Sequence, residues 1–231
     1  MIENILSFAE QFTRMDIDGT VIHCPYWMNK IVDGQVKLRG FLEGKGTPDE
    51  IHQELVKRLH QQFPNQTVHL TVQFIQKFAK RERIGIDCSG FVFQVLDKLV
   101  KLKYNNCRVN SLSQIFKSGI RRTNADTLTG REFCLPVKNV SCMKPGDIVR
   151  MMGGKHIAVL LNITNLFITY VHSARTAKIQ GAHLGKIKII NNDISLDQQE
   201  WLEQTIRNEN YGRRHFKPER GDGVFRLKIF T

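Results

Sequence analysis

The 231-residue sequence contains no apolar run long enough to cross a bilayer, so no membrane-spanning segment is expected. It also begins without the basic region and long apolar stretch of a secretory signal, because Met1 to Leu6 carries an early acid. These two absences leave open a cytoplasmic protein and one that is exported by a non-classical route. With only six prolines, no internal repeat and no low-complexity tract, an ordinary globular chain is expected.

Cysteines are few, and their spacing does not indicate a structural role. The chain has five of them, an odd number, and no CxxC pair. This argues against both a disulfide framework and a clustered zinc site. At least one thiol is therefore free, and the question is which thiol is placed to react.

Acidic residues are also few: the sequence has 22 Asp and Glu but 34 Lys and Arg, which gives a formal charge of +12. Such a surface favours anionic partners such as nucleic acid, anionic lipid or a cell-wall polymer. The basic clusters are scattered along the chain, and none lies in a known nucleic-acid motif. We therefore expect contact with an anionic polymer rather than with nucleic acid. A basic surface that serves only solubility is the alternative.

The order of apolar patterns predicts a single α+β domain over residues 1–231, with a mostly helical portion at 1–83 and a core at 84–231. Helices are expected at 3–13, 47–63 and about 70–78, with an irregular stretch at 16–46, and a longer helix from Cys88 to about Leu102. After a loop-rich stretch at 104–141, strands are expected at 148–151, 156–161, 167–172, 186–190 and 224–230. A last helix is expected to open at Ser195 and to contain Leu202 and Ile206.

The most informative stretch is Gly85-Ile86-Asp87-Cys88-Ser89-Gly90-Phe91, because it places a cysteine at a predicted helix start. Asp87 is a suitable N-cap, and Gly90 would let the first turn pack closely against a neighbouring sheet. The helix dipole and the free N–H groups there would lower the thiol pKa to roughly 3.5–7.5 and could receive an oxyanion. The alternative is a buried, inert thiol.

Two histidines end the two strands of a predicted hairpin. If its loop is centred on Thr164, residue 159 faces residue 169 and His156 lies directly opposite His172. Two imidazoles so placed can act as a base and its orienting partner, whereas a one-residue slip would separate them. The remaining candidates lack partners or metal-ligand spacing and are expected to be structural: Cys107, Cys134, Cys142, His183 and His215.

Four segments, taken in order, resemble the NlpC-type cell-wall peptidases, a family of papain-like cysteine peptidases. They are Asp87 to Phe91, Met143 to Val149, Lys155 to Val159 and Val171 to Ala174, so the resemblance covers residues 84–175. It implies a papain-like core, in which the nucleophile helix packs on an antiparallel sheet, and a triad of Cys88, His156 and His172. It further implies that Asp87 and Ser89 hold the amino end of a peptidoglycan or muropeptide substrate, cut between D-γ-glutamyl and the diamino acid.

The chain departs from that family in two places. A Pro-Tyr element usually precedes the cysteine closely, and its tyrosine borders the oxyanion site. Nothing of that kind lies at residues 65–87, and the best match is Pro25-Tyr26-Trp27. Tyr26 is therefore the candidate, with a packed aromatic pair as the alternative. The small residue two positions after the base, often Gly in the family, is Ala158.

Together these patterns predict a cysteine hydrolase that cleaves a peptide or amide bond through a thioester. Cys88 would attack, His156 would take and return the proton, and His172 would fix the imidazole tautomer. No metal or organic cofactor is needed for this chemistry. Acyl transfer is one alternative, although related acyltransferases often carry His before Cys. A non-catalytic basic module that binds cell wall or nucleic acid is another, and the complete Cys/His/His set argues against it.

Overall fold

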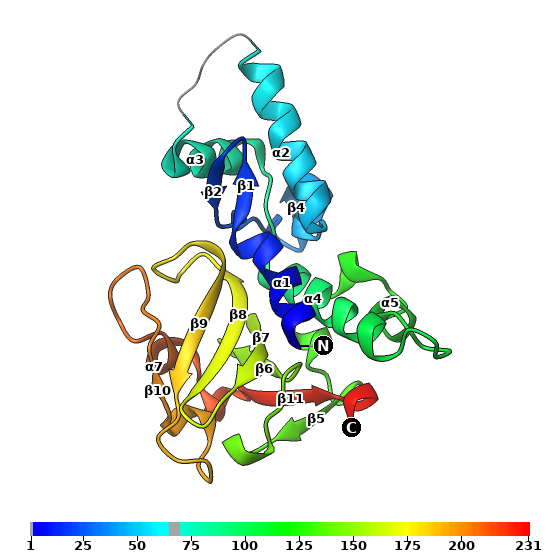
Figure 1. The fold of residues 1–231 in the computed structure, drawn as a ribbon, viewed down its shortest axis with the longest axis vertical. Helices are drawn as coiled ribbons and strands as arrows, with labels where there is room; N and C mark the ends of the chain where they lie inside the picture. Colours follow the sequence, from blue (N-terminus) through cyan, green and yellow to red (C-terminus); the bar gives the residue numbers. More distant parts are fainter. Residues whose placement is uncertain (1, 65–69) are drawn as a thin grey trace.

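A computed structural model describes residues 2–64 and 70–231 and shows an α+β protein built around a curled antiparallel sheet (Figure 1). The α+β class is thus confirmed. The strands follow one another across the sheet in the order β10-β9-β8-β7-β6-β11-β5. Their bounds are β5 Cys134–Val137, β6 Ile148–Met151, β7 His156–Ile163, β8 Phe167–Ala174, β9 Gly181–Lys188, β10 Glu200–Trp201 and β11 Gly223–Leu227.

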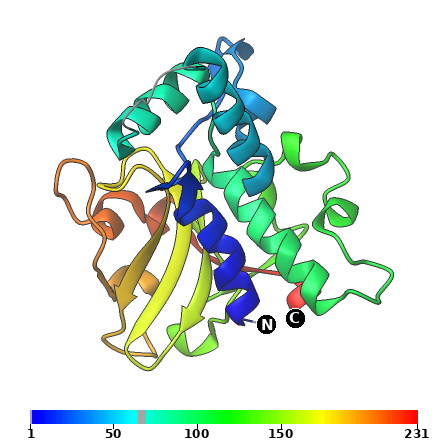
Figure 2. The same ribbon diagram turned by 45° about the horizontal axis from the view of Figure 1, so that its top comes forward.

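Two long helices lie against the central strands. Helix α4 (Cys88–Lys103) contacts β7 and β8, and α1 (Ile2–Thr13) contacts both α4 and β9. Figure 2 shows α1 in blue running alongside α4 in green. The buried rings of Phe12 and Phe91 join the two helices, with their centroids 4.8 Å apart. Burial of a Phe side chain contributes about 1.5–3 kcal/mol, so this contact helps to fix the first turn of α4.

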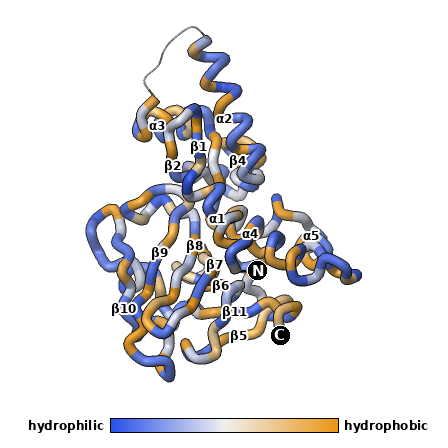
Figure 3. The backbone as a smooth tube through the Cα atoms, in the orientation of Figure 1, coloured by the Kyte–Doolittle hydropathy of each residue, from blue (hydrophilic) through white to orange (hydrophobic). Residues whose placement is uncertain are grey.

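The N-terminal portion adds helices α2 (Pro48–Gln62) and α3 (Val72–Glu82), as expected from the sequence. The predicted capping box starts α2: Glu50 N donates to Thr47 Oγ1 at 3.2 Å, and Thr47 N donates to a carboxylate oxygen of Glu50 at 2.8 Å. Hydrophobic and hydrophilic segments alternate along α2 (Figure 3), because only one face of the helix is buried.

The expectation of an irregular stretch at 16–46 was wrong, because the stretch contains two hairpins. They pair β1 (Met15–Ile17) with β2 (Thr20–Ile22) and β3 (Lys30–Val32) with β4 (Gln35–Leu38). Each turns at an Asp-Gly pair whose residues both have positive φ: Asp18 and Gly19, then Asp33 and Gly34. Asp-Gly is a strong hairpin signal, so the sequence contained this information.

Other expected boundaries also change. The loop-rich stretch 104–141 holds short helices α5 (Leu112–Ile115) and α6 (Ala125–Leu128) and strand β5. Strand β5 pairs only with β11 at the sheet edge, where Pro136 is tolerated. Strand β9 begins at Gly181, five residues earlier than expected, and β11 ends at Leu227.

The helix expected from Ser195 is absent. A 3-10 turn (Leu196–Gln198) and the short strand β10 take its place, and β10 pairs with β9. The two residues meant to form its buried stripe, Leu202 and Ile206, are exposed, whereas Trp201 is buried and donates its indole N–H to Leu196 O at 3.2 Å. Tertiary packing of Trp201 therefore overrides a weak local helix signal.

The Pro-Gly-Asp segment is structural. Both carboxylate oxygens of Asp147 accept from the Arg226 guanidinium, at 2.7 and 2.8 Å, which ties this turn to β11. Gly146 N donates to Leu160 O in β7, and Leu160 N donates back to Asp147 O in the turn, each at 2.8 Å. The turn thereby fixes the start of β6 and its pairing with β7. In the two described ranges, no helix is long and apolar enough to cross a membrane.

Candidate active site

Cys88 is the first residue of α4, and its position follows from the cap before it. Asp87 is the N-cap, and its Oδ1 accepts from Gly90 N at 2.6 Å. The thiol is buried, with the residue only 7% exposed. The backbone N–H groups of Ser89 and Ile157 are near enough to the sulfur to act on its pKa. Because Ile157 directly follows His156, the thiol lies at the start of β7, where the candidate base is.

The expected lowering of the thiol pKa was wrong in direction. Burial, helped by the neighbouring Asp87 carboxylate, raises the pKa of Cys88 to about 12, against the opposing effects of Lys45 and the two N–H groups. Burial likewise holds the pKa of His156 well below its usual value, and the neighbouring His172 lowers it further. The helix dipole acts on Cys88, but loss of water from a buried thiol outweighs it. The resting pair is therefore a neutral thiol and a neutral imidazole.

His156 and His172 are in contact, although not in the register expected from the sequence. His156 Nε2 lies 2.8 Å from His172 Nδ1, and both residues are buried. Val159 pairs with Val171 instead of residue 169, and a bulge follows between Leu160 and Asn162. The histidines are thus diagonal neighbours. A shift of two residues keeps both side chains on the same face of the sheet, so the contact survives the register error.

Two residues that the sequence reasoning missed complete this cluster. His172 Nε2 lies 3.0 Å from His183 Nε2 and 3.1 Å from Glu203 Oε1, and His183 Nε2 lies 3.0 Å from the same oxygen. The expectation that His183 has no partner was therefore wrong. Strand pairing brings it to His172, which it faces across β8 and β9. Glu203 follows β10, where a helix had been expected, so no local pattern could reveal it. These three side chains also form a group whose ligand atoms lie close enough together to hold a metal ion.

The electrostatics of this cluster depend on Glu203. Burial alone would raise its carboxyl pKa, but electrostatic attraction to His172 and hydrogen bonds with His172 and His183 outweigh burial and hold that pKa well below its usual range. The Tyr170 hydroxyl also donates to Glu203. Burial lowers the pKa of His172, and the Glu203 carboxylate opposes this shift. Glu203 is thus a buried anion behind the histidine pair.

Tyr26 comes close to Cys88 despite their separation in sequence. Residues Pro25 to Trp27 run beside Ile86: Ile86 N donates to Pro25 O at 2.9 Å, and Trp27 N donates to Ile86 O at 3.3 Å. Gly85 permits this approach, because a Cβ there would lie 2.3 Å from Pro25 O. Burial raises the pKa of the Tyr26 hydroxyl, and the nearby Cys88 and Asp87 raise it further.

A cavity of about 400 Å³ opens beside Tyr26. Its lining includes three cationic side chains from two different parts of the chain: Lys77, Lys80 and Arg175. Arg175 is close enough to Tyr26 to counter the rise of its pKa. The space beside Tyr26 is therefore positively charged and suits an anionic ligand.

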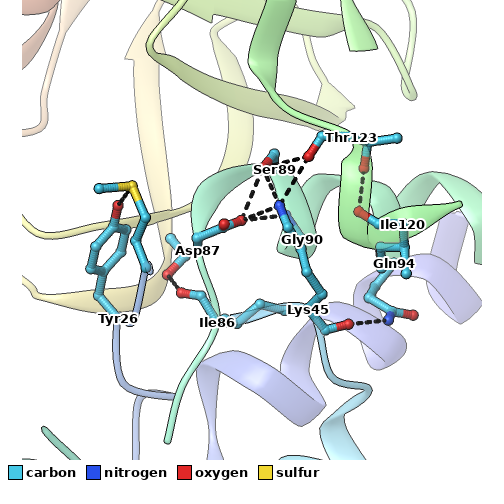
Figure 4. A network of polar contacts seen from close by, with 11 residues as sticks. Tyr26, Lys45, Ile86, Asp87, Ser89, Gly90, Gln94, Ile120 and Thr123 are labelled. Atoms are coloured by element: carbon cyan, nitrogen blue, oxygen red, sulfur yellow. Dashed lines mark hydrogen bonds and ion pairs between the residues drawn. The ribbon is translucent and has the colours of Figure 1, made fainter. Parts of the chain in front are cut away.

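Asp87 and Ser89 are already occupied by a side chain of the same protein. Lys45 Nζ donates to Asp87 Oδ1 at 2.9 Å, to Thr123 O at 3.2 Å and to Ser89 Oγ, and Ser89 Oγ in turn donates to Asp87 at 3.0 Å (Figure 4). The ammonium group is buried. Gly90 allows this packing, because a Cβ there would lie 2.5 Å from Gly44 O. The expectation that Gly90 packs against a sheet was therefore wrong, since the close neighbour of the first turn is the 44–45 backbone.

Comparison with known proteins adds no family to this geometry. No family model, no curated protein and no solved structure matches the chain. The resemblance to NlpC-type peptidases therefore remains a prediction from four short segments.

Proposed function

We propose that the chain is a cysteine hydrolase that cleaves a peptide or amide bond, with Cys88 as nucleophile, His156 as base and His172 as the residue that orients the base. One observation carries the proposal. A buried cysteine begins a helix against the start of the strand that carries His156, and His156 Nε2 lies 2.8 Å from His172 Nδ1. A nucleophile beside an oriented base is the arrangement that thiol catalysis requires.

The hydrogen bonds assign the tautomers of this pair. His172 Nε2 donates to the Glu203 carboxylate, so its Nδ1 is the acceptor for His156 Nε2–H. His156 then has its lone pair on Nδ1, which is the basic nitrogen left for Cys88. Glu203 is thus a positioning residue that acts through His172.

From a neutral resting pair, the proton moves as the sulfur attacks. The S–H proton passes to His156 Nδ1 while the sulfur–carbon bond forms, and the imidazolium is stabilised by His172 and Glu203 behind it. His156 then donates this proton to the leaving nitrogen, and water hydrolyses the thioester. We assign oxyanion stabilisation to backbone N–H groups near Cys88 and to the Tyr26 hydroxyl.

The substrate we propose is a peptidoglycan stem peptide or muropeptide, cleaved at the D-γ-glutamyl–diamino acid bond. Such peptides carry free carboxylates, and the cationic cavity beside Tyr26 supports an anionic substrate. The net charge of +12 supports additional contact with an anionic wall polymer. Asp87 and Ser89 would take a free amino end only after Lys45 leaves them, since its ammonium fills their acceptor positions.

Digestion of defined soluble muropeptides tests this proposal. We expect two products whose masses add to the substrate plus one water, with a new free amino group on the diamino acid. Replacement of Cys88 by Ala should abolish them, whereas Cys142→Ala, which changes an exposed thiol, should not. Intact muropeptides after prolonged incubation with folded protein would rule out this substrate class. Transfer of the acyl group to an added amine, without hydrolysis, would indicate an acyltransferase.

A further inference from the structure

We propose that His172, His183 and Glu203 form a binding site for a zinc-type divalent metal ion, and that an ion bound there switches off His156 as a base. The second half of this statement rests on the proposed hydrolase function, while the first half does not. The site lies behind the histidine pair, on strands β8 and β9 and on the segment after β10.

With both histidine rings neutral, the metal-free arrangement has too few hydrogens for its short contacts. His172 Nε2, His183 Nε2 and Glu203 Oε1 all lie 3.0 to 3.1 Å from one another. His183 Nδ1 lies 2.9 Å from Gly181 O, which can only accept, so the neutral His183 ring carries its proton on Nδ1. Its Nε2 lone pair then points at a carboxylate oxygen. One hydrogen, on His172 Nε2, cannot satisfy three contacts, and a cation at the centre would.

The donor set and its surroundings suit zinc. Two imidazole nitrogens and one carboxylate oxygen form a common zinc set, at about 2.0–2.2 Å from the ion, and tetrahedral ligands then lie about 3.4 Å apart. The three atoms need to separate by only about 0.3–0.4 Å to reach that spacing. The outer contacts are also those that metal ligands use: His183 donates its other N–H to a backbone carbonyl, and Glu203 accepts from the Tyr170 hydroxyl.

An ion at this site would reverse the tautomers of the pair. Coordination uses the His172 Nε2 lone pair, so the single proton of the neutral ring must move to Nδ1. Nδ1–H then donates to His156 Nε2, which accepts, and the one proton of His156 is left on Nδ1. No proton is gained or lost by either ring. The nitrogen that should receive the Cys88 proton is now occupied, so the metal-bound enzyme lacks its base.

Zinc binding can be measured without substrate. In a Cys88→Ala background, which removes the nucleophilic thiol, we expect one tight Zn²⁺ site by competition with a chromophoric chelator. His183→Gln and Glu203→Gln should each weaken Zn²⁺ binding at least about a hundredfold. This exceeds the loss that follows when a residue that only hydrogen-bonds to a metal ligand is changed. His60→Gln changes an exposed histidine outside the cluster and should leave the affinity unchanged. Equal affinity in all four proteins would overturn the site.

The tautomer reversal has its own readout. Long-range ¹H–¹⁵N spectra of the histidine rings in Cys88→Ala should show His156 protonated on Nε2 without metal and on Nδ1 with Zn²⁺. This measurement needs no ligand variant, so it decides the matter even if His183→Gln and Glu203→Gln fail to fold. Unchanged His172 and His156 signals at saturating Zn²⁺ would overturn the proposal. If zinc binds and the tautomers reverse but no muropeptide is cleaved, the proposed function fails while the metal site stands.

Discussion

His156 Nε2 and His172 Nδ1 lie 2.8 Å apart across β7 and β8, although the strand register makes the two residues diagonal rather than opposite neighbours. The contact depends on both side chains standing on one face of the sheet. It leaves each ring one further nitrogen: His172 Nε2 lies 3.1 Å from Glu203 Oε1, and His156 Nδ1 is the nitrogen that we propose as the base for Cys88. This division gives the two histidines unequal tasks.

Removal of either histidine should therefore have a graded effect on hydrolysis. His156→Ala should lower kcat/KM at least about a thousandfold, because the proton then has no acceptor. His172→Ala should cost less, and His172→Gln or His172→Asn should recover part of the loss by accepting the same hydrogen bond. Steady-state kinetics on a cleaved muropeptide, with thermal melts to show folding, measures this. Full activity of His172→Ala would mean that another residue orients the base, and activity of both Ala variants would exclude the triad.

The start of α4 was predictable because its signals are local. Asp87 caps the helix, and apolar residues recur after Cys88 at helical spacing, so α4 (Cys88–Lys103) was found almost to the residue. Lys45 and Glu203 were not predictable. Lys45 reaches Asp87 from 42 positions away, and Glu203 reaches His172 only because β10 pairs with β9. The pKa of Cys88 was misjudged for a related reason, since burial of a thiol is a tertiary property that a helix-start motif does not contain.

The raised thiol pKa predicts how Cys88 reacts with small electrophiles. Since burial raises that pKa to about 12, little thiolate exists at pH 6, and the alkylation rate should rise about tenfold per pH unit between pH 6 and 9 without a plateau. Exposed Cys107 and Cys142 should be modified first at pH 6. Peptide mass mapping after brief exposure to iodoacetamide, with Cys88→Ala as the reference, gives the rates. A plateau for Cys88 below pH 7 would show a resting thiolate and contradict the neutral pair.

Stability should fall in mild acid because buried histidines stay neutral in the fold. Burial lowers the pKa of His215 to about 4 and also lowers that of His23. An unfolded histidine titrates near about 6.5, so below that pH the unfolded chain takes up protons that the native chain does not. The free energy of unfolding should therefore decrease as pH falls toward 5, and His215 should contribute at most about 2 kcal/mol because solvent screens its half-buried ring.

Urea unfolding at pH 5 and pH 7.5 measures this dependence. His215→Gln has no ring to titrate, so its free energy of unfolding should decrease less between pH 7.5 and pH 5, by the part assigned to His215. His60→Gln changes an exposed histidine and should show the same decrease as the parent protein. Equal stability of the parent protein at the two pH values, or greater stability at pH 5, would contradict the assigned protonation states.

Lys45 should control which amino ends the site accepts. Its buried ammonium would compete with and repel a second ammonium at Asp87 and Ser89, so the parent protein should prefer substrates whose amino end is acylated. Lys45→Gln removes the charge and should shift the ratio of kcat/KM toward the free amine, while Lys45→Arg should not. The Gln variant should also be less stable by about 3–5 kcal/mol, since it leaves a buried carboxylate unpaired. A parent preference for free amino ends would refute this role.

The central claim is that Cys88 carries the acyl group of the substrate during turnover. Rapid acid quenching of the parent protein with a muropeptide that it cleaves, followed by intact and peptide mass spectrometry, tests this most directly. We predict a transient mass increase equal to the acyl half of the substrate, located on the peptide that contains Cys88 and absent from Cys88→Ala. Cleavage that proceeds at the parent rate in Cys88→Ala, with no adduct on Cys88 in the parent at any quench time, would contradict it.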